Sequence, residues 1–467
     1  MKTEKARYIV LTDINRGIEQ DDIQSLVRLL LYSNDIEIEG LIACTSCFLK
    51  HGAKKKNEQI IHQIIDAYLR VKPNLDVHAN GYPSADYLHS VTCCGIPKYG
   101  KAFGNGFGEE KYCNNAGVRK IISCAFKNDS RPLYIGIWGG ANTLAQAIWT
   151  AEKECSKADF RRFLSKLRIY AISDQDFAGK WIRDHYGEQL FYIVTPSHGS
   201  RKGSRDYFKA AWPGMSADRN NHGSEDGVHN GGFCGADYSL VSNSFIRKRI
   251  RSKKPYGKCY PYSRFIMEGD SPSYLALIPN GLNCPEHPDY GGWGGRYEKY
   301  IPEVAFADEK YPIWTNAFDC VKGNDGKFHK SPQATIWRWR EAVQNDFLSR
   351  LEWTVCSSYE TANHPPHIET KKTIFYAERN ERIRLDVSVG CQDGAQCTYK
   401  WLVYHEAGEN SQGVALNEYG LYADLITSDT DSFEIHIIFE VQSIINDLPI
   451  TKYKRFIIYS EDKENRT

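Results

Sequence analysis

Hydrophobic residues in the first half of the chain alternate between short continuous runs and helical periods. Residues 8–12 form an apolar, β-branched run that ends at Asp13, as is typical of a buried strand in a parallel sheet. Residues 23–32 place their apolar side chains on one helix face, and residues 36–43 form a second run. This succession predicts a parallel sheet that is covered by helices.

The alternation continues to about residue 194. We expect a helix over residues 58–71 and a strand over residues 75–79. Further elements follow in the order strand, helix, strand, helix, strand over residues 133–138, 143–155, 167–172, 181–185 and 190–194. The predicted fold class is therefore α/β, with a Rossmann-like, mostly parallel sheet that has helices on both faces.

Residues 195–262 show no clear period and are rich in Gly, Asn, Ser, Arg and aromatic residues. A segment of this length without regular structure is usually functional, and a solvated insertion is the alternative. Order resumes at residue 265, and residues 336–353 are expected to form an amphipathic helix that closes the first domain.

The sequence Asn-His-Pro-Pro at residues 363–366 is typical of a linker. Beyond it the chain carries short alternating runs that predict strands over residues 373–377, 382–389, 398–404, 433–440 and 454–459. These runs predict a small all-β, immunoglobulin-like sandwich. We therefore expect an α/β domain over residues 1–360 and a β-sandwich domain over residues 368–467.

Composition narrows the range of partners. At roughly 100–200 residues per domain, 467 residues suggest two or three domains. The net charge of +1 argues against a nucleic acid polymer as partner. Apolar runs are too short to cross a membrane, and the charged N-terminus does not lead into a signal-peptide core. A cytoplasmic location is expected on this basis, with a secreted mature form left open.

The chain has 14 cysteines, and without a secretion signal we expect free thiols in a reducing compartment. Cys44 and Cys47 are separated by two residues, and Cys93 and Cys94 are adjacent. Structural zinc sites usually space paired cysteines by two to four residues, so the adjacent pair argues against zinc.

Acidic residues follow several of the predicted strands. Because ligands of an open parallel sheet bind at the carboxyl ends of its strands, these side chains are expected at one edge. They are Asp13, Asp21, Asp22, Asp174, Asp176 and Asp270. An aspartate at a helix start is often only a cap, but gathered carboxylates repel one another unless a cation holds them. Ca²⁺ takes six to eight oxygen ligands, so Asp13, Asp22 and Asp270 are predicted to share one.

Several of these motifs resemble a known family. The sequence Val-Leu-Thr-Asp at residues 10–13, followed by Asp21 and Asp22, resembles the N-terminal aspartate motif of inosine–uridine nucleoside hydrolases. Residues 139–145, Gly-Gly-Ala-Asn-Thr-Leu-Ala, resemble the loop of that family that offers a main-chain carbonyl to calcium.

Further stretches resemble a divergent branch that is often labelled cellulose-binding. It joins a nucleoside hydrolase-like domain to a C-terminal immunoglobulin-like domain. The stretches that carry this resemblance are residues 172–176, 267–273, 278–282, 292–297 and 399–408. The resemblance covers almost the whole chain, and Glu-Gly-Asp-Ser-Pro and Trp-Gly-Gly-Arg are its more specific motifs.

The resemblance implies a role for each acidic residue. Asp13 would take a proton from a calcium-bound water, and Asp21 would hold sugar hydroxyls during catalysis. Asp174 and Asp176 would occupy the places of ribose-binding residues. The implied calcium ligands are Asp13, Asp22, Asp270 and the carbonyl of Asn142, which also lies in the substrate region.

The function that follows is calcium-dependent hydrolysis of a glycosidic bond through an oxocarbenium-like transition state. Nucleoside hydrolases typically have a histidine just before the late aspartate, where this chain has Gly269. Glu268 is the candidate replacement acid, with a structural role as the alternative. Glu19 and Asn15 lie in the loop before Asp21 and could replace a ligand. Both N- and O-glycosides stay open as substrates.

The expected partner is a small glycoside or an oligosaccharide, on whose rings Trp181, Trp212 and Trp293 would stack. One alternative is a carbohydrate-binding protein that kept the fold without turnover, and another is a scaffold whose sandwich docks to a partner. His222, His229 and His287 lie in polar loops and are candidate leaving-group acids or plain surface residues. Since nucleoside hydrolases are commonly oligomeric, a homo-oligomer also stays open.

Overall fold

An eight-stranded sheet forms the centre of the N-terminal part of the chain. The computed structural model describes residues 4–197, 209–216, 235–303, 308–392 and 394–461. The strands of the sheet are β1 (Ala6–Thr12), β2 (Ile36–Ala43), β3 (Thr92–Cys94), β6 (Leu133–Ile137), β7 (Leu167–Ala171), β8 (Phe191–Ile193), β9 (Tyr297–Tyr300) and β10 (Ile313–Asn316). Their order is β3-β2-β1-β6-β7-β8-β10-β9, and only the β9–β10 pair is antiparallel.

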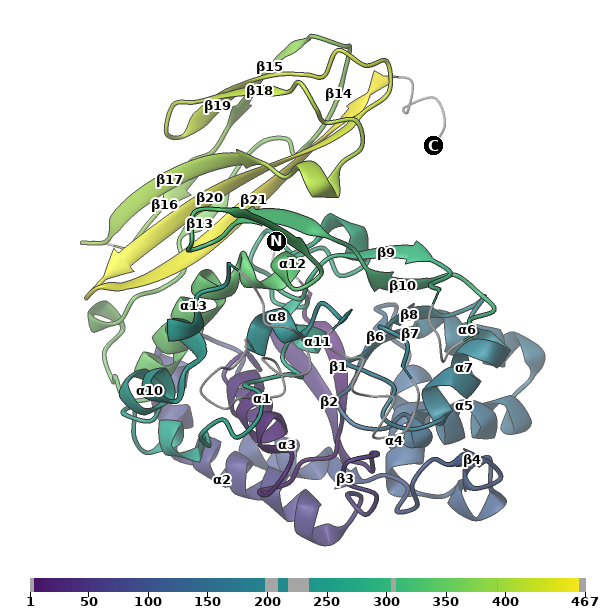
Figure 1. Ribbon diagram of the computed structural model, residues 1–467. Helices are drawn as coiled ribbons and strands as arrows, with labels where there is room; N and C mark the ends of the chain where they lie inside the picture. Colours follow the sequence, from purple (N-terminus) through teal and green to yellow (C-terminus); the bar gives the residue numbers. More distant parts are fainter. Residues whose placement is uncertain (1–3, 198–208, 217–234, 304–307, 393, 462–467) are drawn as a thin grey trace.

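Helices cover both faces of this sheet (Figure 1). They are α1 (Gln20–Leu30), α2 (Lys55–His78), α3 (Ala85–Ser90), α4 (Ala116–Ala125), α5 (Asn142–Glu154), α6 (Lys157–Lys166) and α7 (Ala178–Tyr186). Tyr8 and Val10 of β1 belong to the core under α1 and α2, whereas Ile9 and Leu11 belong to the core under α4 to α7. Alternate residues of one strand thus bury on opposite faces, which explains why the run is apolar throughout.

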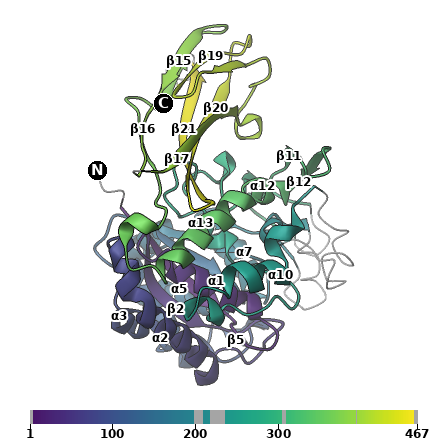
Figure 2. The same cartoon turned by 90° about the vertical axis from the view of Figure 1, so that its left-hand side faces the viewer.

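The C-terminal part is a β-sandwich that lies above the α/β part in both views (Figures 1 and 2). Its strands are β13 (His367–Glu369), β14 (Ile374–Ala377), β15 (Arg382–Asp386), β16 (Ser388–Gly390), β17 (Gln396–Val403), β18 (Ala415–Glu418), β19 (Tyr422–Ile426), β20 (Glu434–Ile445) and β21 (Leu448–Ser460). The sheet β14-β21-β20-β17 packs on the sheet β15-β19-β18 through a core that includes Trp401, Phe439 and Leu425. The predicted fold class is confirmed.

Shorter elements connect these layers. They are β4 (Ala102–Phe103), β5 (Gly106–Phe107), β11 (Asp319–Lys322), β12 (Phe328–Ser331), α8 (Pro213–Ser216), α10 (Asn243–Phe245), α11 (Pro272–Leu275), α12 (Ala334–Trp337) and α13 (Arg340–Trp353). Single 3-10 or π turns are η1 (Glu110–Tyr112), η4 (Tyr238–Val241), η5 (Ile246–Ile250), η6 (Tyr256–Cys259), η7 (Pro288–Tyr290), η8 (Tyr359–Thr361) and η9 (His405–Ala407). The described part of residues 195–262 therefore consists of short turns and helices.

The prediction of a strand over residues 75–79 is wrong. Helix α2 continues through Pro73 to His78. Pro73 is exposed, so its ring points to solvent, while Tyr68, Val71, Leu75 and His78 stay buried at helical spacing. The third strand of the sheet, β3, lies later in the chain and is only three residues long.

The helix expected over residues 336–353 is two helices, α12 and α13, and it is not amphipathic. Buried residues occur around the whole circumference of α13, because β21 of the sandwich packs on it while other neighbours belong to the α/β part. Ile438 and Tyr453 of the sandwich belong to the same core as Phe347 of α13. The helix is therefore an internal joint between the two parts of the chain.

The cysteines depart from the expectation in one respect, because Cys391 and Cys397 form a disulfide. The other described cysteines are free. In the described part of the chain, the residue groups with metal-ligand spacing contain carboxylates only. No helix among the described residues is long and apolar enough to cross a bilayer.

A buried ion network ties the two parts of the chain together. Asp319 accepts hydrogen bonds from Arg296 and Arg338 at 2.7 Å each and from the Tyr404 hydroxyl of the sandwich at 2.7 Å. Burial alone would raise the pKa of Asp319, but Arg338 and Arg296 outweigh it and hold the pKa below its usual value.

We expect Asp319→Ala to lower the free energy of unfolding by about 3–5 kcal/mol, because two guanidinium groups would stay buried without their carboxylate. Urea unfolding followed by circular dichroism measures the change. Asp431→Ala is the matched control, because it removes a carboxylate whose ion pair with Arg379 is exposed, and it should leave stability almost unchanged. Equal effects of the two variants would contradict the structural role of Asp319.

Candidate functional site

The sheet has a topological switch point between β1 and β6. From β1 the chain proceeds to β2 and β3 on one side, and it returns to β6 on the other side. Connections leave the carboxyl ends of these two strands in opposite directions, which opens a crevice where ligands of such sheets bind. Asp13 directly follows β1, and the N–H groups of Trp138 and Gly139, which follow β6, donate to the Leu11 carbonyl at 2.8 and 3.2 Å.

Four aspartates from two distant stretches of the sequence meet at this crevice, three from residues 13–22 and the fourth at Asp270. Ligand oxygens of Asp21, Asp22 and Asp270 lie within 4.8 Å of one another. A second group with the same spacing joins Asp13 and Asp22 to Glu19. Asp21 and Asp22 lie in the first turn of α1, and Asp270 precedes α11. Asp22 belongs to both groups, so it lies close to Asp13 on one side and to Asp270 on the other.

The carboxylates of this cluster are buried and have few hydrogen-bond donors. Asp22 accepts from the Thr12 hydroxyl. Neither oxygen of Asp13, and not Oδ2 of Asp270, has a well-aligned donor among the described residues. In the same part of the chain, no lysine or arginine forms an ion pair with Asp13, Asp21, Asp22 or Asp270. The cluster therefore lacks the counter-charge that buried carboxylates normally require.

Burial raises the pKa of Asp13 and of Asp21 to about 7. Near Asp13, the Ser46 hydroxyl lowers the pKa and the Asp21 carboxylate raises it, both by less than burial does. The pKa values of Asp22 and Asp270 are raised well above the usual range, first by burial and then by repulsion from the other carboxylates. Oxygen ligands, clustered negative charge and missing donors together fit a hard divalent cation such as Ca²⁺.

Asp176 lies on the other side of the Gly139–Gly140 turn. Its carboxylate accepts from the N–H groups of Asn142 and Ala178 at 2.9 Å each, and burial raises its pKa to about 7. A Cβ atom on Gly139 would lie 2.8 Å from Asp13 Oδ1, and one on Gly140 would lie 2.5 Å from Asp176 Oδ2. Only glycine lets the backbone pass between these carboxylates.

Asn142 has a different position from the one implied for a calcium ligand. It is the first residue of α5, where a backbone carbonyl is used by the helical hydrogen-bond ladder. Its N–H group orients Asp176, and its side-chain amide donates to the Lys98 carbonyl at 2.8 Å. These contacts give Asn142 a positioning role.

Asp174 does not face a substrate, contrary to the expectation. Both of its oxygens accept from Arg183 at 2.8 Å, and the Arg183 guanidinium also pairs with Glu309 at 2.9 Å. The Asp174 and Arg183 side chains are each 1% exposed. A sugar would have to displace a buried ion pair to reach Asp174, so this carboxylate holds α7 to the sheet.

Glu268 is not the replacement acid either. It forms a buried ion pair with Arg28 and also accepts from the hydroxyls of Tyr260 and Ser271. Its backbone has a φ of 52°, which turns the chain sharply before Gly269. Both oxygens of this carboxylate are thus engaged by side chains of the protein, and they face Arg28 rather than the acidic cluster. The structural alternative holds for Glu268.

The three tryptophans have different surroundings. Trp293 is fully buried, with its ring edge-on to Tyr453 of the sandwich, so it has no free face for a sugar and the expectation is wrong. Trp212 is also buried, and a Cβ on Gly269 would lie 3.0 Å from its ring, which places it at the border of the acidic cluster. Trp181 alone is partly exposed.

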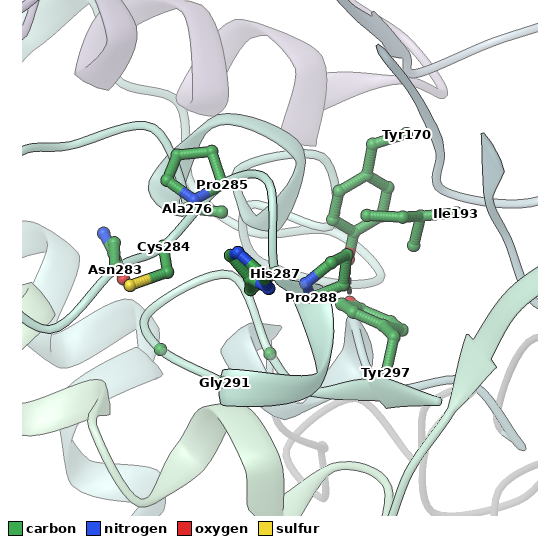
Figure 3. Close-up of a pocket in the computed structure, with 12 residues that line it drawn as sticks. Tyr170, Ile193, Ala276, Asn283, Cys284, Pro285, His287, Pro288, Gly291 and Tyr297 are labelled. Atoms are coloured by element: carbon green, nitrogen blue, oxygen red, sulfur yellow. Dashed lines mark hydrogen bonds between the residues drawn. The ribbon is translucent and has the colours of Figure 1, made fainter. Parts of the chain in front are cut away.

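His287 lies beside a very small cavity that is also lined by Tyr170, Cys284 and Tyr297 (Figure 3). The cavity has a volume of about 30 Å³, which is room for about one water, and no member of the acidic cluster lines it. The His287 ring stacks on Tyr290 at 4.5 Å. A leaving-group role is thus unsupported for His287, and His222 and His229 lie outside the described residues.

A larger pocket of about 690 Å³ opens beside Phe177. It is lined by Cys47, Phe48, Leu49, Lys50, His51, Tyr99, Lys101 and Phe177. Phe177 directly follows Asp176 and donates its N–H to the Gly100 carbonyl at 3.0 Å, while the Cys47 N–H donates to the Gln175 carbonyl at 2.7 Å. Its volume is in the usual range for a small-molecule site. The sequence analysis missed these residues, although most lie on loops that follow the carboxyl ends of β2, β3 and β7.

Two comparisons with known proteins give matches, one over residues 7–297 and the other over almost the whole chain. The family model described as "Cellulose-binding Sde182, nucleoside hydrolase-like domain" matches residues 7–297. A solved structure is similar over 98% of this chain and 100% of its own, with a TM-score of 0.77 and 29% identity. It is a nucleoside hydrolase-related hypothetical protein from Saccharophagus degradans that is associated with carbohydrate metabolism. No curated protein matches the chain.

The cluster generates a prediction about calcium and pH. Asp13 and Asp21 have pKa values of about 7 in the folded state and 3.8 in the unfolded state. Each carboxyl therefore binds its proton more tightly in the folded protein. Without a cation, stability should therefore fall as pH rises from about 4 to 7. Added Ca²⁺ should raise the melting temperature more at pH 8 than at pH 5, because protons then compete less for the same oxygens.

Differential scanning calorimetry in chelator-treated buffer, with and without CaCl₂, measures both effects. Asp22→Ala should abolish the calcium effect, and the exposed control Asp431→Ala should retain it. A calcium effect of the same size in Asp22→Ala would show that the ion binds elsewhere.

Proposed function

Since the chain belongs to the family described as "Cellulose-binding Sde182, nucleoside hydrolase-like domain", we propose that it is a calcium-dependent hydrolase of a glycosidic bond. One observation carries the proposal. Buried carboxylates of Asp13, Asp22 and Asp270 gather at the switch point of the sheet without a basic partner in the described chain. A protein that used this edge only for stability would gain nothing from the repulsion between them.

Asp13, Asp22 and Asp270 would hold the cation, with Glu19 within reach of the first two. When bound, Ca²⁺ would neutralise the cluster and make a coordinated water more acidic. Asp13 would accept a proton, because neither of its oxygens has a well-aligned donor among the described residues. Thr12 meanwhile holds Asp22 in place through its hydroxyl.

Two further carboxylates would bind and polarise the sugar. Asp21, at 8% exposure, is the least buried of the four aspartates and can accept from sugar hydroxyls. Asp176 is fixed by two backbone N–H groups and directly precedes Phe177, which lines the larger pocket. Negative charge from both would stabilise the positive charge that develops on the sugar ring as the bond to the leaving group breaks.

Binding of carbohydrate without turnover is the second candidate. It is favoured by the ion pair of Glu268 with Arg28, which removes the acid that the sequence offered for the leaving group. The cellulose-binding part of the family description agrees with this candidate. Under this proposal the cluster would hold an ion that orders the edge of the sheet.

Asp13→Asn separates the two candidates. If Asp13 accepts the proton, the substitution should lower kcat by roughly 10²–10⁴-fold while the protein stays folded. Release of sugar or base is measured on nucleosides, nitrophenyl glycosides and cello-oligosaccharides with CaCl₂ present. Asp431→Asn, at an exposed position of the sandwich, is the matched control and should keep full activity. Absence of turnover by the parent on all these substrates, with oligosaccharide binding retained, would establish the second candidate.

A further inference from the structure

We propose that the larger pocket, with Lys50 and Lys101 in its lining, binds an anionic group of a sugar whose ring lies at the acidic edge. The position of the sugar ring rests on the proposed function, whereas binding of the anionic group does not. The ligand class to which we commit is an acidic sugar derivative. Its charge would be a carboxylate or a phosphate, because both accept charge-assisted hydrogen bonds from lysine.

The lining of this pocket is basic. Of its eight residues, Lys50, His51 and Lys101 carry basic side chains and none is acidic. All three basic residues are exposed, so a ligand can reach them. Other lysines of the domain, such as Lys55 with Glu58, are paired with a carboxylate. Lys50 and Lys101 form no such pair with a described residue, so their charge is available to a ligand.

The two lysines come from different loops and meet at Tyr99. The Lys50 ammonium lies 5.4 Å from the centre of the Tyr99 ring, within the range of a cation–π contact. Lys101 follows Tyr99 by two residues, and its N–H donates to the carbonyls of Tyr99 and Asn105 at 2.9 and 3.0 Å. Both positive charges are therefore brought to one pocket by an ordered tyrosine and an ordered turn.

The loop that carries Lys50 starts next to the acidic cluster. The Ser46 hydroxyl lies beside Asp13 and lowers the pKa of that carboxyl. Its oxygen also accepts from the N–H groups of Phe48 and Leu49 at 3.0 and 2.9 Å, and the Ser46 N–H donates to the Leu49 carbonyl at 3.1 Å. The loop is thus fixed by its own hydrogen bonds at the point where the crevice meets the pocket.

The opposite wall of the pocket lies against Asp176. Gly100 stands between Tyr99 and Lys101, and a Cβ on it would lie 2.6 Å from Asp176 Oδ2. Burial raises the pKa of Tyr99, and the negative charge of Asp176 raises it further. Two lining residues of the pocket therefore flank a residue that touches a carboxylate of the acidic edge.

Opposite charges on the two sides would fix the orientation of an acidic sugar. The buried carboxylates of Asp13, Asp22 and Asp270 repel an anion unless a cation neutralises them, whereas the two lysines attract it. A charged substituent is favoured only when it points away from the crevice, which leaves the uncharged sugar ring toward the carboxylates. A neutral sugar would gain nothing from the lysines, so the same contacts would also discriminate between ligands.

Isothermal titration of the full chain with CaCl₂ present tests the proposal. It compares nitrophenyl glucuronide with nitrophenyl glucoside, and glucose phosphate with glucose. The parent should bind the charged member of at least one pair roughly ten-fold more tightly, which corresponds to about 1.4 kcal/mol. A preference in the first pair identifies a carboxylate and one in the second pair a phosphate. Added NaCl should reduce the preference, because salt screens exposed charges.

Three double variants assign this preference to the pocket. Replacing Lys50 and Lys101 together by glutamine should abolish it and leave the affinity for the neutral sugars unchanged. Replacing both by arginine should preserve it, because the positive charge stays. Replacement of Lys371 and Lys372 by glutamine is the matched control, since it removes the same charge from exposed positions of the sandwich and should preserve the preference.

The outcomes separate this inference from the proposed function. Asp13→Asn should retain the preference for charged sugars even where hydrolysis is lost. Hydrolysis of neutral glycosides by a parent without any charge preference would overturn the inference and leave the proposed function intact. Binding of charged sugars without hydrolysis would do the reverse. Equal affinity within both pairs, no binding of either charged sugar, or a preference that persists in the glutamine variant of the pocket would each overturn the inference.

Discussion

Repulsion among four buried carboxylates is the constraint on which this structure depends. Asp13, Asp21, Asp22 and Asp270 come from three separate elements and meet at the edge where β1 and β6 part. The first turn of α1 offsets part of the cost, since the positive end of the helix dipole favours Asp21 and Asp22 there. The remainder has to be offset by protons or by a cation, because burial and mutual repulsion raise the pKa values of Asp22 and Asp270.

Other buried acidic residues of the described chain form ion pairs with arginines, as is typical of carboxylates that stabilise a fold. Glu268 faces Arg28, Asp174 faces Arg183, and Asp319 faces two arginines. Each of these carboxylates has its charge balanced by at least one guanidinium, and the Glu268–Arg28 pair connects residues that are 240 positions apart. Pairing with arginine therefore distinguishes carboxylates that stabilise the fold from carboxylates that are available to a ligand. This distinction rests on the structure alone and needs no comparison with related proteins.

The difference between paired and unpaired carboxylates also explains which site residues could be predicted from the sequence. Strand ends are visible in the hydrophobic pattern, so the rule that ligands bind at carboxyl ends was sufficient to find Asp13, Asp22 and Asp270. The sequence did not reveal that Arg28, 240 residues away, pairs with Glu268. It also did not reveal that Tyr453 of the sandwich lies against the Trp293 ring. Partners across such separations leave no local signal. The strand expected at residues 75–79 failed for a local reason, because the buried spacing of Tyr68, Val71 and Leu75 already continued the helix past Pro73.

The pocket of about 690 Å³ bears on what the acidic edge would have to accomplish by itself. Its lining residues come from loops that follow β2, β3 and β7, so a ligand that extends from the crevice into the pocket would contact groups remote from the acidic cluster. Binding energy from such remote units can be used to distort and orient the sugar ring at the reacting bond. This matters more in a chain where Glu268 is occupied by Arg28, because less help then comes from proton donation to the leaving group.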